Sequence, residues 1–336
     1  MTRYDAYQRA IGYLRVSVTD RCNLRCVYCM PAEGVPSCTH DEILRYEEIE
    51  TVVRAAAELE IHKVRLTGGE PLVRRGIVDL VRRLSAVPGI DDLSMTTNGI
   101  LLSRYAADLK RAGLKRVNVS LDTLRPERFR QITRCGELAD ALAGIEAARR
   151  VGLNPVKINA VIIRGLNADE VIDLAYKTVS DGWHVRFIEW MPVGAPTVGG
   201  MEWESGVVTT DAIRTQIEAA LGPLEPASTQ AGAGPARYYR LAGARGPLTV
   251  GTVGFISPLS EHFCGTCNRL RLTADGKLRP CLLSSHEIDL RGALRAGAGV
   301  EEMKALLAAG IAAKPEGHHL HECEPVHGRT MSQIGG

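Results

Sequence analysis

The chain has 336 residues, 45% hydrophobic residues, 24% charged residues and a formal net charge of +2. These values are ordinary for a globular protein, and the near-neutral charge argues against bulk binding of nucleic acid or of a membrane surface. The length fits a barrel with an appendage, and local arginine clusters remain able to bind one anionic small molecule.

The first eighteen residues lack the uninterrupted apolar run of a signal peptide, and no segment approaches the roughly 18 apolar residues of a membrane span. We therefore expect a cytoplasmic protein without a membrane partner. Disulfides are rare in that compartment, so clustered cysteines favour metal binding or catalysis. The chain contains nine cysteines.

Short β-branched segments alternate with amphipathic helical segments as far as residue 190. The predicted strands are 11–18, 62–67, 92–97, 115–121, 156–163 and 184–190. Predicted helices between them include 46–60, 76–87, 104–113 and 138–152. This alternation predicts parallel βαβ units in an α/β fold, a partial (βα)6 barrel. Functional groups should gather at the C-terminal ends of its strands.

The remainder of the chain, 191–336, is predicted to be a C-terminal region beside a barrel domain that spans 1–190. Residues 191–235 are rich in Gly, Pro, Ser and Thr and show no motif. Strands are predicted at 238–243 and 247–256, followed by a hairpin that turns at Asp275-Gly276. Two short helices, near 287–296 and 300–313, precede a polar tail that ends in IGG.

Three cysteines, Cys22, Cys26 and Cys29, follow the first predicted strand within DRCNLRCVYCMP. Three thiolates on one loop can hold three irons of a [4Fe–4S] cluster and leave the fourth iron open to an external ligand. Structural zinc prefers four ligands. Cys38 or His40 would be the fourth ligand of a zinc site, which is the alternative interpretation of this triplet.

The motif CNLRCVYC, followed by RLTGGEP, resembles the radical S-adenosylmethionine (SAM) superfamily. The resemblance implies that SAM chelates the open iron and that reduction cleaves SAM to a 5′-deoxyadenosyl radical. The glycines of TGGEP let the backbone approach a ligand closely, and Glu70 is expected to meet an ammonium group. The residues that resemble SAM contacts are Tyr28, Gly69, Ser120 and Met191.

A second triplet, Cys264, Cys267 and Cys281, is spaced C-x2-C-x13-C. In isolation this spacing is typical of a zinc ribbon, with His262 as a candidate fourth ligand. Two triplets that each lack a fourth cysteine suggest instead two [4Fe–4S] clusters with one open iron each, one for SAM and one for substrate.

Further motifs narrow the resemblance to the GTP 3′,8-cyclase family of molybdenum cofactor biosynthesis. They are VRLTGGEPLVRRG, MTTNG, NVSLD, VKIN, RFIEWM, CNRLRLTADGKLRPCL and the terminal IGG. The implied reaction starts when the adenosyl radical abstracts the ribose 3′ hydrogen of GTP, and C3′ then attacks guanine C8. The resemblance also implies a flavodoxin- or ferredoxin-type electron donor and a downstream cyclic pyranopterin monophosphate synthase, and it leaves a homodimer open.

The same resemblance assigns residues to the substrate. The expected GTP contacts are Arg15, Arg65, Thr96, Lys157, Arg269, Leu270 and Arg271. Arg186 is expected to be catalytic, and the tail residues Gly335 and Gly336 are expected to reach the active site. Arginine suits a triphosphate because its planar guanidinium binds phosphate in a bidentate manner.

Two other functions compete with this interpretation. One is a radical SAM peptide-modifying enzyme with auxiliary clusters, and the other is a zinc-binding module without chemistry. Cys38, Cys135 and Cys323 fall outside both triplets and receive no role. The segment HHLHEC at 318–323 resembles a metal site, but the family interpretation needs no metal there.

Overall fold

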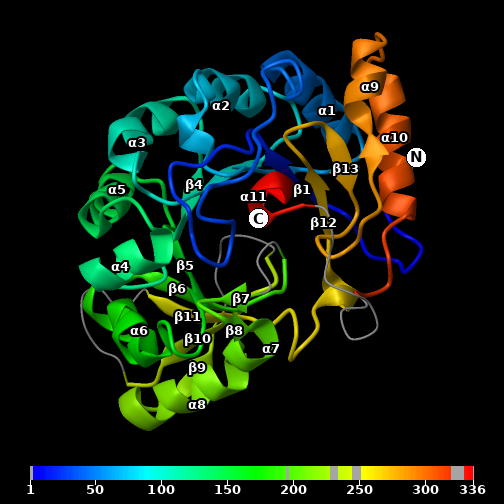
Figure 1. Cartoon of the computed structure of the whole chain (residues 1–336). Helices are drawn as coiled ribbons and strands as arrows, with labels where there is room; N and C mark the ends of the chain where they lie inside the picture. Colours follow the sequence, from blue (N-terminus) through cyan, green and yellow to red (C-terminus); the bar gives the residue numbers. More distant parts are fainter. Residues whose placement is uncertain (1–2, 194–196, 228–233, 244–250, 319–328, 336) are drawn as a thin grey trace.

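The computed structural model describes residues 3–193, 197–227, 234–243, 251–318 and 329–335. One twelve-stranded sheet runs through the described chain in the order β14-β13-β12-β1-β2-β3-β4-β5-β6-β11-β10-β9. Figure 1 shows that this sheet curves, with helices along its outer side and the C-terminal helix α11 inside the curve.

The six strands predicted before residue 190 are all present and parallel to their neighbours. They are β1 (Tyr13–Ser17), β2 (Lys63–Thr67), β3 (Asp92–Thr97), β4 (Arg116–Ser120), β5 (Lys157–Ile162) and β6 (His184–Glu189). Each lies within two residues of its predicted limits. The partial barrel therefore forms where the β-branched segments predicted it.

Helices cover the outer face of these strands. They are α1 (Tyr46–Glu58), α2 (Ile77–Ser85), α3 (Leu102–Arg111), α4 (Pro126–Thr133), α5 (Leu138–Arg150) and α6 (Val171–Ser180). In β2, Val64 and Leu66 belong to the hydrophobic core, whereas the alternate residues Lys63, Arg65 and Thr67 line an internal cavity. Because alternate residues of a strand face opposite sides, the strands pack one face on helices and turn a polar face inward.

The C-terminal region extends both edges of the same sheet. Next to β6 lie β11 (Thr252–Ile256), β10 (Arg237–Leu241) and β9 (Leu224–Pro226). Next to β1 lie β12 (Arg269–Leu272), β13 (Lys277–Arg279) and β14 (Ile288–Asp289). β11 and β12 run parallel to the barrel strands, so the sheet continues across the division predicted at residue 190.

The described part of 191–235, which shows no sequence motif, contains two short strands and two helices. It holds β7 (Thr197–Val198), β8 (Met201–Glu202), α7 (Trp203–Gly206) and α8 (Thr210–Leu221). α8 begins after Thr209, whose side chain accepts a hydrogen bond from the backbone N–H of Ala212, as N-capping residues do.

The predicted hairpin turn at Asp275-Gly276 is confirmed between β12 and β13. The two short helices are α9 (Leu290–Arg295) and α10 (Val300–Ala312), and α10 packs against α1. The remaining elements are η1 (Pro71–Val73), η2 (Ala168–Glu170), η3 (Cys264–Thr266) and α11 (Met331–Ile334). Among the described residues, no helix has the length and apolar character needed to cross a membrane.

Candidate active site

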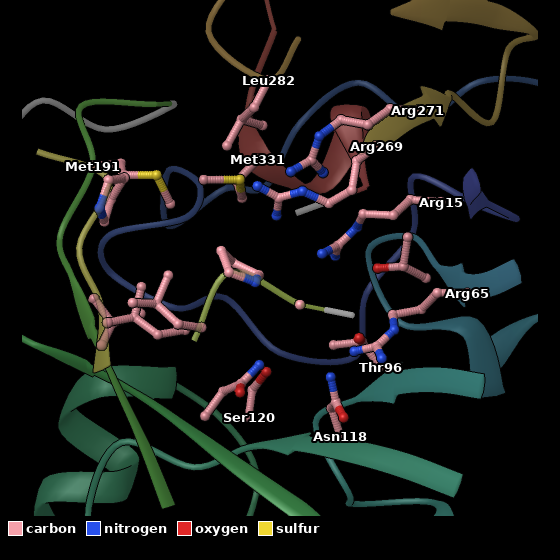
Figure 2. A pocket seen from close by; sticks show the side chains of 18 of the residues that line it. Arg15, Arg65, Thr96, Asn118, Ser120, Met191, Arg269, Arg271, Leu282 and Met331 are labelled. Atoms are coloured by element: carbon pink, nitrogen blue, oxygen red, sulfur yellow. The ribbon is translucent and has the colours of Figure 1, made fainter. Parts of the chain in front are cut away.

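A cavity of about 320 Å³ occupies the inside of the curved sheet. Both cysteine triplets line it, although they lie more than two hundred residues apart in the sequence. The other predicted site residues that line it are Arg15, Tyr28, Arg65, Gly69, Thr96, Ser120, Lys157, Arg186, Met191, Arg269 and Arg271. The fold thus brings nearly every predicted site residue to one cavity (Figure 2).

The loop that carries the first triplet is held by the glycines that follow β2. The backbone N–H of Gly69 donates to the carbonyl of Thr19 at 2.7 Å. A Cβ on Gly68 or on Gly69 would lie 2.4 Å from the carbonyl oxygen of Thr19 or of Arg21, respectively. These glycines therefore allow two backbone segments to touch, and Gly68 also has a φ of 155°.

Glu70 is held inside the fold at the end of β3. Its side chain is fully buried and does not line the cavity. Its carboxylate accepts hydrogen bonds from the Thr97 hydroxyl at 2.8 Å and from the backbone N–H of Asn98 at 2.7 Å. Burial raises its pKa to about 7. That Glu70 meets an ammonium group stays a prediction.

The thiols of the first triplet lie in an apolar environment that disfavours thiolates. Burial raises the pKa of Cys22 to about 11 and that of Cys29 to about 12, and it raises the pKa of Cys26 well above its usual value. The neighbouring thiols raise the pKa of Cys26 further. A metal centre that binds here must therefore stabilise the thiolates itself.

The arrangement of ligands bears on which metal centre would fit. Within the described part of the chain, no three His, Cys, Asp or Glu side chains converge on a point where one metal ion would sit. Each triplet offers three thiols, one fewer than the four ligands of a structural zinc site, whereas a [4Fe–4S] cluster with one iron open to an external ligand would need three.

Tyr28, between two of these cysteines, is held by an acid of β4's C-terminal end. Its hydroxyl donates to Oδ2 of Asp122 at 2.6 Å, and Oδ1 of Asp122 accepts from the backbone N–H of Val161 at 2.8 Å. Burial raises the pKa of Asp122 to about 6. Both Tyr28 and Asp122 line the cavity, so the Asp122 carboxylate positions the tyrosine ring at its wall.

The second triplet is tied together by a buried lysine. The Nζ of Lys314 donates to the carbonyl of Arg269 at 2.9 Å and to the carbonyl of Pro280 at 2.7 Å. The first carbonyl follows Cys267 closely and the second directly precedes Cys281. Lys314 thus joins the two chain segments that carry these cysteines.

A second buried cation supports the same region from the N-terminus. The guanidinium of Arg9 pairs with Asp5 at 2.6 Å and donates to the carbonyl of Cys264 at 2.8 Å. It also donates to the carbonyls of Pro315 and Glu316. Three segments distant in sequence are therefore fixed around the second triplet.

These cations change the chemistry of one thiol. Burial raises the pKa of Cys267, but the positive charges of Arg269 and Lys314 outweigh that effect and lower the pKa to about 6. Burial raises the pKa of Cys264. The second triplet therefore has a thiolate already favoured at neutral pH, unlike the first.

Arg269 and Arg271 point into the cavity from β12, as Figure 2 shows. Leu270 between them is fully buried in the hydrophobic core and does not line the cavity. The alternation of a strand explains the difference. Of the expected GTP contacts, Leu270 is the one whose side chain faces away, which leaves only its backbone near a ligand.

The other cations come from neighbouring strands. Arg15 on β1 is in register with both Arg271 on β12 and Arg65 on β2. Burial and the charge of Arg271 lower the pKa of Arg15. The cavity wall here carries several cations and few carboxylates, so it suits the binding of a polyanion.

Two further cations of the cavity, Lys157 and Arg186, come from β5 and β6. Burial lowers the pKa of Lys157 to about 7, and Arg186, Arg116 and Arg65 lower it further. Burial also lowers the pKa of Arg186. Among the described residues, Nε and Nη2 of Arg186 are buried and have no hydrogen-bond partner.

The C-terminal tail returns to this cavity. Met331 and Ser332 of α11 line it, and Nη1 of Arg271 donates to the carbonyl of Gly335 at 3.0 Å. Gly335 has a φ of 77°, and a Cβ there would lie 2.9 Å from Cβ of Ser17. Gly336 lies outside the described residues, as do Cys323 and most of the segment 318–323.

Several polar residues of the cavity wall were not predicted from the sequence. They are Lys63, Asp92, Arg116, Asn118, Asn159, Tyr238 and Lys314. The strand residues among them could have been found, because Lys63 lies two positions before Arg65 and Asn118 two positions before Ser120. Residues with that spacing share a face of a strand. Cys38 and Cys135 do not line the cavity.

Two family models match the chain. The radical SAM superfamily matches residues 16–176, and the family described as molybdenum cofactor synthesis C matches residues 183–320. The two matches together cover the barrel and most of the region that carries the second triplet.

Curated relatives match along the whole length. A GTP 3′,8-cyclase of Pelotomaculum thermopropionicum is 59% identical, and one of Moorella thermoacetica is 52% identical. In each case the match covers 99% of this chain and 99% of the relative.

Solved structures share the fold at low identity. Streptococcus suis SuiB has a TM-score of 0.60 at 13% identity and covers 97% of this chain and 78% of its own. SuiB bound to S-adenosylmethionine has a TM-score of 0.58 at 14% identity and covers 96% and 77%. These similarities support the architecture alone.

Proposed function

The chain belongs to the GTP 3′,8-cyclase family of radical SAM enzymes, and from this premise we propose how its residues divide the work of the reaction. The enzyme converts GTP to (8S)-3′,8-cyclo-7,8-dihydroguanosine 5′-triphosphate, in the first step of molybdenum cofactor biosynthesis. The predicted fold class is confirmed, and neither alternative function is favoured.

The first triplet is proposed to hold a [4Fe–4S] cluster at whose open iron SAM binds. When bound, the reduced cluster supplies the electron that cleaves SAM to a 5′-deoxyadenosyl radical. Gly69 brings its backbone to the cavity wall, and Asp122 holds Tyr28 there. Ser120 and Met191 line the same cavity and are the other proposed SAM contacts. The apolar surroundings that raise the thiol pKa values also keep water away from a radical.

The second triplet is proposed to hold another [4Fe–4S] cluster, at which the guanine binds. Between the two triplets, Arg15, Arg65 and Lys157 are available for the triphosphate, with Arg269 and Arg271 beside the guanine-side cluster. Arg186 contributes buried, unpartnered N–H groups, and we propose that it contacts the reacting nucleotide. Charged hydrogen bonds of this kind contribute about 1.5–3 kcal/mol each.

One observation carries the proposal: two three-cysteine sets and a group of cations line a single cavity in a chain of this family. The test is to incubate the anaerobically reconstituted, reduced protein with SAM and GTP. We expect 5′-deoxyadenosine and a cyclised nucleotide to form together. Formation of 5′-deoxyadenosine with peptide substrates, but not with GTP, would contradict the proposal.

The tail is proposed to complete the substrate site. The hydrogen bond from Arg271 to the Gly335 carbonyl supports this role, as does the lack of space for a side chain at Gly335. Deleting Gly335 and Gly336 should leave iron content and SAM cleavage largely intact and block cyclisation. Normal product from the truncated protein would show that the tail is a loose end.

An electron donor of flavodoxin or ferredoxin type is proposed to dock beside the first triplet. Arg21 and Arg134 are exposed there, and the described residues offer neither of them a salt bridge. Nη1 of Arg134 donates to the carbonyls of Arg25 and Met30 on the cysteine loop. R21E should slow reduction by an acidic flavodoxin but not by dithionite; equal slowing by both would reject this surface. A homodimer and a contact with the downstream synthase stay predictions that the family resemblance implies for this chain.

A further inference from the structure

Two asparagine side chains inside the barrel make no hydrogen bond within the described structure. Oδ1 of Asn118 on β4 and Oδ1 of Asn159 on β5 are buried without a donor, and both side chains line the cavity. Asn118 is 1% exposed. A buried amide oxygen without a partner is costly, so such atoms in a cavity indicate a ligand that supplies the missing donor.

The sheet register gives the depth of Asn118 in the cavity. Arg116, Asn118 and Ser120 of β4 all face inward, and alternate residues of a strand stand about 7 Å apart. Arg116 lies at the start of β4, where it pairs with Asp92, and Ser120 lies at the C-terminal end of the strand, on the proposed SAM side. Asn118 lies between them along the strand, and Figure 2 shows Asn118 and Ser120 next to each other on the cavity wall.

The neighbours of Asn118 at this depth come from the adjoining strands. Thr96 on β3 and Lys157 on β5 are its register partners. Oγ1 of Thr96 is also buried without a hydrogen-bond partner. Two orphaned oxygens, an amide and a hydroxyl, therefore face the cavity side by side.

The stereochemistry of ribose matches this arrangement. Both hydroxyls of a ribonucleotide lie on one face of the ring, and the C3′ hydrogen lies on the other. If the C3′ hydrogen points toward SAM at Ser120, the two hydroxyls point away from SAM, toward Asn118 and Thr96.

We propose that Asn118 accepts a hydrogen bond from the vicinal ribose hydroxyls of GTP, and so selects ribose and turns the C3′ hydrogen toward SAM. This inference rests on the proposed function, because it requires GTP in the cavity. Asn118 acts as a specificity and positioning residue for the sugar, and Thr96 provides a second oxygen for the same pair of hydroxyls.

The test compares binding of GTP and of 2′,3′-dideoxy-GTP to the reconstituted protein, by equilibrium dialysis without SAM. The wild type should bind the dideoxy nucleotide about tenfold more weakly. Without the hydroxyls a hydrogen bond is lost and the Asn118 oxygen stays buried without a donor, which together raise the Kd by about a factor of ten. N118A should lose most of this preference, and N118A/T96V should bind the two nucleotides within about twofold of each other. N118D keeps acceptor oxygens, so it should bind both nucleotides more weakly but preserve the preference.

The matched control is N159A, which removes the other orphaned amide one level nearer SAM, in register with Ser120. It should keep the wild-type preference, and thermal unfolding and iron content should show that all variants are folded and loaded. An unchanged preference in N118A, or a lost preference in N118D, overturns the assignment while GTP binding itself stands. Failure of the wild type to bind GTP overturns the proposed function and this inference together.

Discussion

The two cysteine triplets are built in opposite ways. The first lies on one short loop after β1, where burial raises the pKa of all three thiols. The second is assembled from η3 and the segment after β13, which Lys314 joins through backbone carbonyls. There, Arg269 and Lys314 lower the pKa of Cys267 to about 6 against the effect of burial.

This difference separates two requirements of one reaction. An apolar loop suits the generation of a radical, because it excludes water and competing donors. A cation-rich site suits an anionic cluster beside an anionic nucleotide, because both need positive charge nearby. If the two triplets do different work in the reaction, a change at one triplet should leave the function of the other in place. The variants below test this separation.

The largest effect is expected at the first triplet. Cys22→Ser, Cys26→Ser or Cys29→Ser should abolish SAM cleavage, because each removes one of three thiolates on the loop. Iron at the second triplet should remain. The measurement is 5′-deoxyadenosine formation together with iron content. Retained SAM cleavage in any one of the three variants would refute the assignment.

A smaller and different effect is expected at the second triplet. Cys264→Ser, Cys267→Ser or Cys281→Ser should lose the cyclised nucleotide, whereas some uncoupled SAM cleavage should survive. Both products are measured in the same incubation. If these variants turn over GTP at the normal rate, the second triplet is structural and the zinc interpretation returns.

The arginines of β12 should affect substrate binding without affecting SAM. R269A or R271A should weaken GTP binding by about 1.5–3 kcal/mol, the range for a charged hydrogen bond. The control R104A removes an exposed arginine of the outer helix α3 and should change nothing. Equal GTP affinity in all three variants would show that the nucleotide does not contact β12.

The smallest effect is a pH dependence that arises from Lys157. Its pKa is about 7 in the empty cavity, lowered mainly by burial, and a bound triphosphate favours the protonated lysine. GTP affinity should therefore fall as the pH rises from 7 to 9, by at most tenfold per unit, and binding should take up protons. K157R stays charged and should lose this dependence. A wild-type affinity that is flat over this range would exclude the lysine from the site.

Both triplets, the six barrel strands and the hairpin turn could be predicted from the sequence, because each of them is a local pattern. What the sequence could not supply is how far the sheet curves. Alternation along β4 places Asn118 on the same face as Ser120, but whether that face encloses a cavity depends on the curvature of all twelve strands.

Lys314 and Arg9 were missed for a related reason. Each binds backbone carbonyls of segments distant in sequence, and a carbonyl leaves no residue-type signal. Glu70 lies in a motif that was identified, but the hydrogen bonds of its carboxylate to Thr97 and Asn98 could not be predicted. Motifs thus located the ligand cysteines, whereas the supporting contacts required the tertiary structure.

The most direct test of the division between triplets is electron paramagnetic resonance of the reduced, reconstituted protein, titrated separately with SAM and with GTP. We expect two cluster signals, of which SAM changes only one and GTP changes only the other. The variant Cys22→Ser/Cys26→Ser/Cys29→Ser should lose the SAM-sensitive signal and keep the GTP-sensitive one. A single signal that responds to both ligands, or loss of both signals in this variant, would contradict the account.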